Sequence, residues 1–108
     1  MNRNSFKNDC AFAYKHVKAT KEWVVVVSLN KDSAEDNRQQ LSFLAPFGDF
    51  SGRTLSLPNG GRITVVSAED DWSCDKPFTV IFSGVSGKKA KTSLWESKAA
   101  YILKVSSI

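Results

Sequence analysis

Apolar and polar positions along the chain form a series of short segments typical of β-strands. The surest strand is Glu22–Leu29, because its four consecutive valines are stiff at χ1 and prefer extended backbone. Upstream, Cys10–Tyr14 alternates larger apolar side chains with alanines, which is the period of a strand with one buried face. A helix capped by Asn8 or Asp9 is the competing interpretation of that segment.

A β-hairpin is predicted in the middle of the chain. Arg53–Leu57 and Arg62–Ser67 both alternate apolar and polar residues. The Pro-Asn-Gly-Gly sequence at 58–61 between them is a strong turn signal, so we expect the two segments to pair antiparallel.

Further strands are predicted on either side of this hairpin. Upstream, Leu41–Leu44 is a short apolar segment that follows the polar residues Ala34–Gln40, which we interpret as a loop or a single helical turn capped by Ser33. Downstream, Phe78–Ser83 is predicted to be a strand. A last strand is expected at Lys91–Leu94, and the remaining residues are predicted to form either a short helix or a further strand.

Short strands separated by turn signals indicate an all-β fold, an antiparallel β-sandwich or small barrel. A chain of 108 residues with 42% hydrophobic residues has the size and composition of one folded domain. We expect residues 1–9 to be a flexible N-terminal segment and residues 10–108 to be the single β-sandwich domain.

The two cysteines, Cys10 and Cys74, each lie beside a predicted strand. A disulfide between them would join the start of the domain to its second half. Small domains with a single core often need such a bridge, so we expect one disulfide. Two unpaired buried thiols are the alternative, and would be usual in a cytosolic protein.

Few side chains could carry out catalysis. His16 is the only histidine, and its position among lysines favours a solvated surface role. The acidic residues Glu69, Asp70, Asp71 and Asp75 do not have the spacing of an EF-hand and are interpreted as a solvated loop. Zinc-binding and phosphate-loop motifs are also missing from the sequence. We therefore expect no catalytic residue, no metal site and no cofactor.

The net charge of +4, with an isoelectric point near 9.2, predicts a mild attraction to acidic surfaces. The residue types used by single-strand nucleic-acid binders are present in Trp23, Trp72, Trp95, Lys88, Lys89 and Lys91. Because the basic residues are spread along the chain, we interpret the tryptophans as core or rim residues and disfavour nucleic acid as a partner. No stretch approaches the roughly 20 apolar residues of a membrane span, so we expect no membrane partner.

The order of the predicted elements resembles the MAX-effector family of plant-pathogenic fungi. Cys10 opens the first predicted strand, and Cys74 lies between Ile63–Ser67 and Phe78–Phe82, where this family places its disulfide pair. The resemblance implies six antiparallel strands in two sheets. It also implies a secreted virulence effector without enzymatic activity, which acts inside host cells and binds a host protein. The resemblance further implies detection by a plant immune receptor that carries a heavy-metal-associated-type domain, which is one candidate partner.

We expect this protein to be a monomer that docks its partner by pairing through an exposed edge strand. The strand with apolar side chains on both faces supplies the candidate contact residues Glu22, Trp23, Val24, Val25, Val26 and Val27. If this strand instead lies inside a sheet, the docking edge is expected at Leu41–Leu44. The alternative function is a bacterial or phage periplasmic inhibitor or immunity protein, and a nucleic-acid-binding module is the third.

Overall fold

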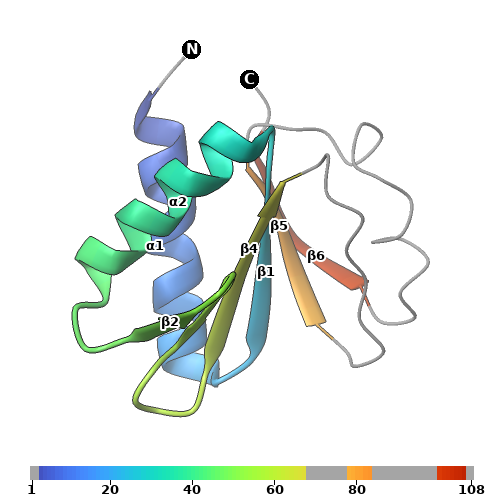
Figure 1. Cartoon of the computed structure of the whole chain (residues 1–108). Helices are drawn as coiled ribbons and strands as arrows, with labels where there is room; N and C mark the ends of the chain where they lie inside the picture. Colours follow the sequence, from blue (N-terminus) through green and yellow to red (C-terminus); the bar gives the residue numbers. More distant parts are fainter. Residues whose placement is uncertain (1–2, 68–77, 84–99, 107–108) are drawn as a thin grey trace.

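The computed structural model describes residues 3–67, 78–83 and 100–106, which form two helices and six strands (Figure 1). The elements are α1 (Arg3–Thr20), β1 (Trp23–Ser28), α2 (Lys31–Leu44), β2 (Asp49–Ser51), β3 (Thr54–Ser56), β4 (Arg62–Ser67), β5 (Phe78–Ser83) and β6 (Ala100–Ser106). The fold is therefore mixed α/β, and the predicted all-β sandwich or barrel is wrong.

The six strands form one sheet in the order β2-β3-β4-β1-β5-β6. Strands β4, β1, β5 and β6 run parallel to one another, and β2 and β3 extend the sheet antiparallel at one edge. Parallel neighbours need a crossover of a dozen or so residues, and α2 lies in the crossover between β1 and β4. Strand β5 lies on the other side of β1 from β4.

The valine run explains why β1 is the centre of this sheet. Val24 to Val27 are all 0% exposed, so the strand is buried on both of its faces. A continuous apolar run of this kind is typical of a parallel strand covered on both sides, whereas a half-exposed strand alternates. Val24 and Val26 belong to the core cluster under the helices, with Ile63, Val65 and Ile81 from the neighbouring strands.

Helix α1 occupies residues for which the sequence predicted a flexible segment and then a strand. Its buried residues Cys10, Ala13 and Val17 follow the spacing i, i+3, i+7 of one helix face. Ala13 is 0% exposed and its neighbour Phe12 is 40% exposed, which is opposite to the predicted alternation. The strand prediction for Cys10–Tyr14 is wrong. The competing helix has the correct type but begins earlier, at Arg3.

Helix α2 begins at a side-chain cap and ends at Leu44, two residues before Pro46. Asn30 Oδ1 accepts a 2.9 Å hydrogen bond from the Ser33 N–H, so the cap is Asn30 and not Ser33. Buried Ala34, Asn37 and Leu41 define one face of the helix. The predicted strand at Leu41–Leu44 is the last turn of this helix, so that prediction is wrong.

The other strand predictions agree with the structure wherever it describes them. Strands β3 and β4 pair antiparallel across the predicted turn, with Leu55 opposite Ile63. Strand β5 has the predicted bounds, and β6 shows that residues 100–106 are a further strand. The strand predicted at Lys91–Leu94 lies outside the described residues.

Both helices lie on the same side of the sheet (Figure 1). On this side they cover the side chains of Ile63, Val65 and Ile81, and the two helices pack against each other. The opposite face of the sheet is also buried, through Val25, Val27, Val66, Val80 and Phe82. Because the middle of the sheet is buried on both faces, positions for a ligand remain at its ends and edges.

Candidate functional site

The predicted docking strand is not at an edge of the sheet. Strand β1 pairs with β4 on one side and with β5 on the other, so its backbone groups already have partners. Of the candidate contact residues, Val24 to Val27 are fully buried, Trp23 is partly buried and Glu22 is exposed. The fallback edge at Leu41–Leu44 is helical. Neither segment can receive a partner strand, which corrects the predicted mode of docking.

The predicted disulfide is also wrong, because Cys10 is a free thiol buried under α2. Its Sγ lies 3.4 Å from Asn37 Oδ1. Loss of hydration on burial, and secondarily the neighbouring charge of Asp9, raises the pKa of Cys10 to about 12. The thiol is therefore protonated and inert at neutral pH. Cys74 lies outside the described residues.

These corrections remove the structural basis of the family resemblance. It depended on a first strand at Cys10–Tyr14 and on a disulfide from Cys10, and the structure has a helix and a free thiol there. The fold therefore gives the resemblance to MAX effectors no support.

His16 lies in a polar group that joins α1 to the amino ends of two strands. Its Nε2 lies 3.0 Å from Glu22 Oε2, which also accepts a 3.2 Å hydrogen bond from Thr79 Oγ1. The hydrogen bond with His16, followed by that from Thr79, lowers the pKa of the Glu22 carboxyl group. The Glu22 carboxylate thus bridges His16 of α1 and Thr79 of β5 and links the helix to the sheet.

The carboxyl ends of parallel strands are the usual ligand site of an open α/β sheet. Here Ser28, Ser67 and Ser83 end three neighbouring strands in register, and all three are 0% exposed. Ser28 Oγ accepts a 2.7 Å hydrogen bond from Asn37 Nδ2. Among the described residues, the buried Ser83 Oγ has no hydrogen-bond partner, whereas Ser28 is hydrogen-bonded to Asn37. This hydrogen bond fixes the packing of α2 on β1, and both of its residues are buried.

Trp23 is one of the aromatic residues on which the nucleic-acid hypothesis depends. Its indole Nε1 donates a 2.8 Å hydrogen bond to Thr64 Oγ1, and the Arg62 guanidinium lies 4.6 Å from its ring centroid. One face of the ring is thus covered by a cation. Trp72 and Trp95 lie outside the described residues.

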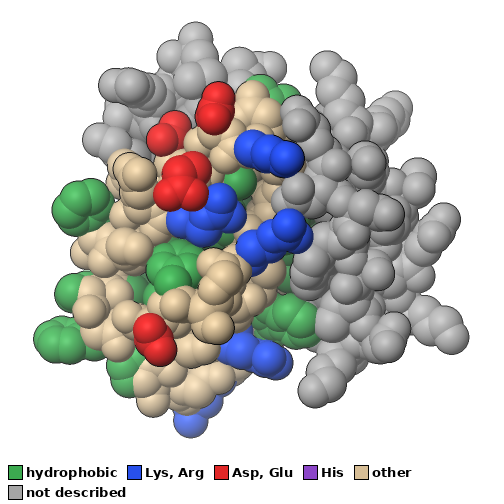
Figure 2. All heavy atoms as spheres, in the orientation of Figure 1, with side chains coloured by type: hydrophobic (Ala, Val, Ile, Leu, Met, Phe, Trp, Pro, Cys, Tyr) green, Lys and Arg blue, Asp and Glu red, His purple; other side chains and the backbone are tan. Residues whose placement is uncertain are grey.

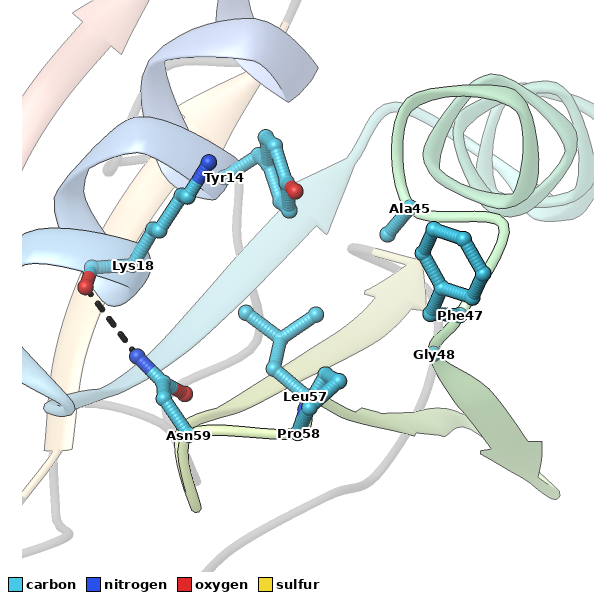
Figure 3. A pocket seen from close by; sticks show the side chains of 8 residues that line it. All are labelled: Tyr14, Lys18, Ala45, Phe47, Gly48, Leu57, Pro58 and Asn59. Atoms are coloured by element: carbon cyan, nitrogen blue, oxygen red, sulfur yellow. Dashed lines mark hydrogen bonds between the residues drawn. The ribbon is translucent and has the colours of Figure 1, made fainter.

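An open pocket of about 250 Å³ lies on the helix side, near the amino ends of β1 and β4. Three separate segments line it: α1, the end of α2 with the following turn, and the β3–β4 turn (Figure 3). The lining residues are Tyr14, Lys18, Ala45, Phe47, Gly48, Leu57, Pro58 and Asn59. Most of this lining is apolar, and Figure 3 shows Tyr14 and Lys18 on one side with Ala45 and Phe47 opposite them.

The β3–β4 turn is held against α1 by the side chain of Asn59 and by the close approach of Gly61 to Val17. Asn59 Nδ2 donates hydrogen bonds of 3.2 and 3.1 Å to the carbonyls of Val17 and Lys18, and Asn59 Oδ1 accepts one of 2.8 Å from the Gly61 N–H. A Cβ at Gly61 would overlap Val17 Cγ1, so this contact requires glycine. This wall of the pocket is therefore preformed.

The opposite wall follows the C-terminus of α2. The Gly48 N–H donates a 2.9 Å hydrogen bond to the Ala45 carbonyl, which closes the turn that presents Phe47. The side chain of Phe47 is 88% exposed, and that of Phe43, in the last turn of α2, is 84% exposed. Figure 2 shows hydrophobic side chains protruding at the edge of the molecule where α2 ends. We name Phe43, Phe47 and the pocket together the α2-end surface.

Sequence reasoning missed this surface, although the sequence contains a signal for it. Ala34, Asn37 and Leu41 have the spacing of one buried helix face. Phe43 does not lie on that face, and Phe47 follows Pro46 outside the helix. Two large aromatic residues are thereby directed away from the core.

Comparison of the chain with protein-family models, curated proteins and solved structures found no match. Neither described helix is long and apolar enough to span a membrane. Among the described residues, no group of three or more His, Cys, Asp or Glu side chains could hold a metal ion.

Proposed function

We propose that this protein is a non-catalytic binding domain that holds a segment of a partner protein on the α2-end surface. The observation that carries the proposal is the near-complete exposure of Phe47, 88%, on the wall of an apolar pocket, together with that of Phe43, 84%, four residues earlier at the end of α2. Large exposed apolar groups next to a concavity are characteristic of interaction sites, and aromatic side chains dominate binding energy at such sites.

The size of the pocket favours a protein segment over a free small molecule. Its volume of about 250 Å³ is below the range of roughly 300–1,000 Å³ that is usual for small-molecule sites. One of its walls, Phe47, is almost fully exposed, so a small ligand there would stay largely in water. A single apolar side chain inserted as an anchor, with neighbouring residues resting on Phe43 and Phe47, would bury these groups together.

The chemistry of the described side chains supports a binding role. Cys10, with its pKa raised to about 12, is a poor nucleophile, and it is fully buried. His16 Nε2 is 3.0 Å from Glu22 Oε2, so this ring nitrogen is engaged by a carboxylate that links α1 to the sheet. The pocket itself is lined by no histidine, cysteine or carboxylate.

Selection from a displayed library of random linear peptides tests this function. We expect the selected peptides to share an apolar or aromatic anchor position. On titration, they should shift the backbone amide resonances of Leu57 and Asn59 more than those of β1. Failure of the library to converge, or shifts that lie away from the α2-end surface, would contradict the proposal.

Substitutions distinguish specific binding at the α2-end surface from non-specific binding to exposed apolar side chains. Phe43→Ala and Phe47→Ala remove side chains that are mostly in solvent, so both variants should fold as the wild type does. Leu29→Ala is the matched control, because Leu29 is 38% exposed and follows β1 at the other end of the sheet. Binding should fall in the first two variants and be retained in the third.

A further inference from the structure

Some of the polar groups that line the pocket already form hydrogen bonds within the protein, and others do not. Both ends of the Asn59 amide make hydrogen bonds, to carbonyls of α1 and to the Gly61 N–H. In contrast, the Tyr14 hydroxyl and the Lys18 ammonium form no hydrogen bond or ion pair with the described residues. These two groups are therefore available to a ligand.

The Lys18 ammonium is placed at the rim of the pocket. It lies 5.7 Å from the centroid of the Tyr14 ring, within the range of a cation–π contact, and the side chain is exposed. Figure 3 shows Lys18 beside Tyr14 on the α1 side of the pocket. The nearest acidic residue in sequence to the lining is Asp49, which follows Gly48 but is not itself a lining residue.

The pocket thus presents an apolar interior with a positive charge on one side of its mouth. We propose that the segment bound there is acidic as well as apolar, with a carboxylate next to the anchor side chain and directed at Lys18. This inference rests on the proposed function and specifies its partner. The net charge of +4 favours such a segment at long range as well.

Lys18 also lies in the last turn of α1, where a cation interacts favourably with the helix dipole. That role acts on stability and does not depend on any ligand. A readout of ligand charge preference therefore distinguishes the two roles of Lys18.

The experiment uses three capped tetrapeptides with two central leucines, flanked by glutamate, glutamine or lysine, and follows the protein amide resonances on titration. We expect the glutamate peptide to bind about two- to fivefold more tightly than the glutamine peptide, the range of an exposed ion pair. The lysine peptide should bind most weakly. The preference should diminish when the salt concentration is raised well above physiological, since salt screens exposed charges.

Variants of Lys18 test whether this residue causes the preference for the glutamate peptide. Lys18→Met keeps the apolar stem and should abolish the preference for glutamate, and Lys18→Glu should reverse it. Lys31→Met is the matched control, because Lys31 is an exposed lysine in the first turn of α2, at the other end of the sheet. It should leave the preference unchanged.

The outcomes separate this inference from the proposed function. Equal binding of the glutamate and glutamine peptides, lost in Phe47→Ala, would overturn the acidic partner and leave the docking surface intact. Binding of none of the peptides at the pocket would contradict both. Binding of 3-phenylpropionate as tightly as the glutamate peptide would indicate a site for small carboxylates, and would overturn the protein segment as occupant.

Discussion

The side-chain amide of Asn37 donates a 2.7 Å hydrogen bond to the hydroxyl of Ser28, and so connects the middle of α2 to the carboxyl end of β1. The two residues are 1% and 0% exposed. On its other side, Asn37 Oδ1 lies 3.4 Å from Cys10 Sγ, so the same amide contacts α1. One buried side chain thus joins both helices and the sheet.

Replacement of Asn37 should destabilise the fold, because buried polar partners left without hydrogen bonds retain their full desolvation cost. We expect Asn37→Leu to lower the free energy of unfolding by about 1–3 kcal/mol in urea denaturation. Gln39→Ala, at an exposed position of the same helix, should change it by less than about 0.5 kcal/mol. Equal stability of the two variants would show that the Asn37 network contributes nothing.

The Cys10 thiol should be free and protected. In a Cys74→Ser background, iodoacetamide at mildly alkaline pH should leave Cys10 unmodified in the native protein and label it fully after denaturation. Burial and a pKa raised to about 12 both suppress the reactive thiolate. In the wild type, denaturing alkylation without reductant should also label Cys10. Recovery of a peptide in which Cys10 is cross-linked to Cys74 would refute the structure at this residue.

The Glu22 carboxylate should make stability depend on pH on the acidic side. Its pKa is lowered in the folded state, first by the hydrogen bond with His16 and then by that from Thr79. A lowered carboxyl pKa contributes stability that is complete above the unfolded-state pKa and is lost as pH falls through the folded-state pKa. Glu22→Gln should therefore be less stable than the wild type at neutral pH, and the difference should close as pH falls below the ordinary glutamate pKa of about 4.3. A difference that is constant across this range would contradict the assignment.

The sequence identified the elements whose signals are local. The valine run of β1, the Pro-Asn-Gly-Gly turn at 58–61 and the alternating residues of β3 and β4 each depend on near neighbours along the chain. The same valine run also carried the signal of a central parallel strand, since it is apolar at every position. The valine run could not identify the strands that pair with β1, because these are residues 62–67 and 79–83, far along the chain.

The helices were predicted only as alternatives and the candidate site was not predicted, for different reasons. In α1 the pattern of Cys10–Tyr14 fits a period of two, and the helical spacing emerges only when Val17 is included. The α2-end surface is formed by three segments, 14–18, 45–48 and 57–59, which meet only in the folded chain. No local pattern marks a site of that kind.

Gly61 should be required for the position of the β3–β4 turn on α1. A Cβ at this residue would overlap Val17 Cγ1, and we expect Gly61→Ala to cost about 1–3 kcal/mol of stability, as overpacking does. Val17→Ala vacates the same space, so the double variant should lose less stability than the two single variants together. Strict additivity in urea denaturation would show that the two residues do not meet.

The affinity of a selected peptide for Phe47→Ala, compared with Leu29→Ala, tests the central claim most directly. Isothermal titration calorimetry on both variants and the wild type gives the three dissociation constants, with thermal unfolding as the check on folding. We predict at least about a tenfold loss for Phe47→Ala, as for an aromatic residue at the centre of an interface, and less than about a twofold change for Leu29→Ala. Equal affinities of Phe47→Ala and the wild type would contradict the assignment of the α2-end surface as the binding site.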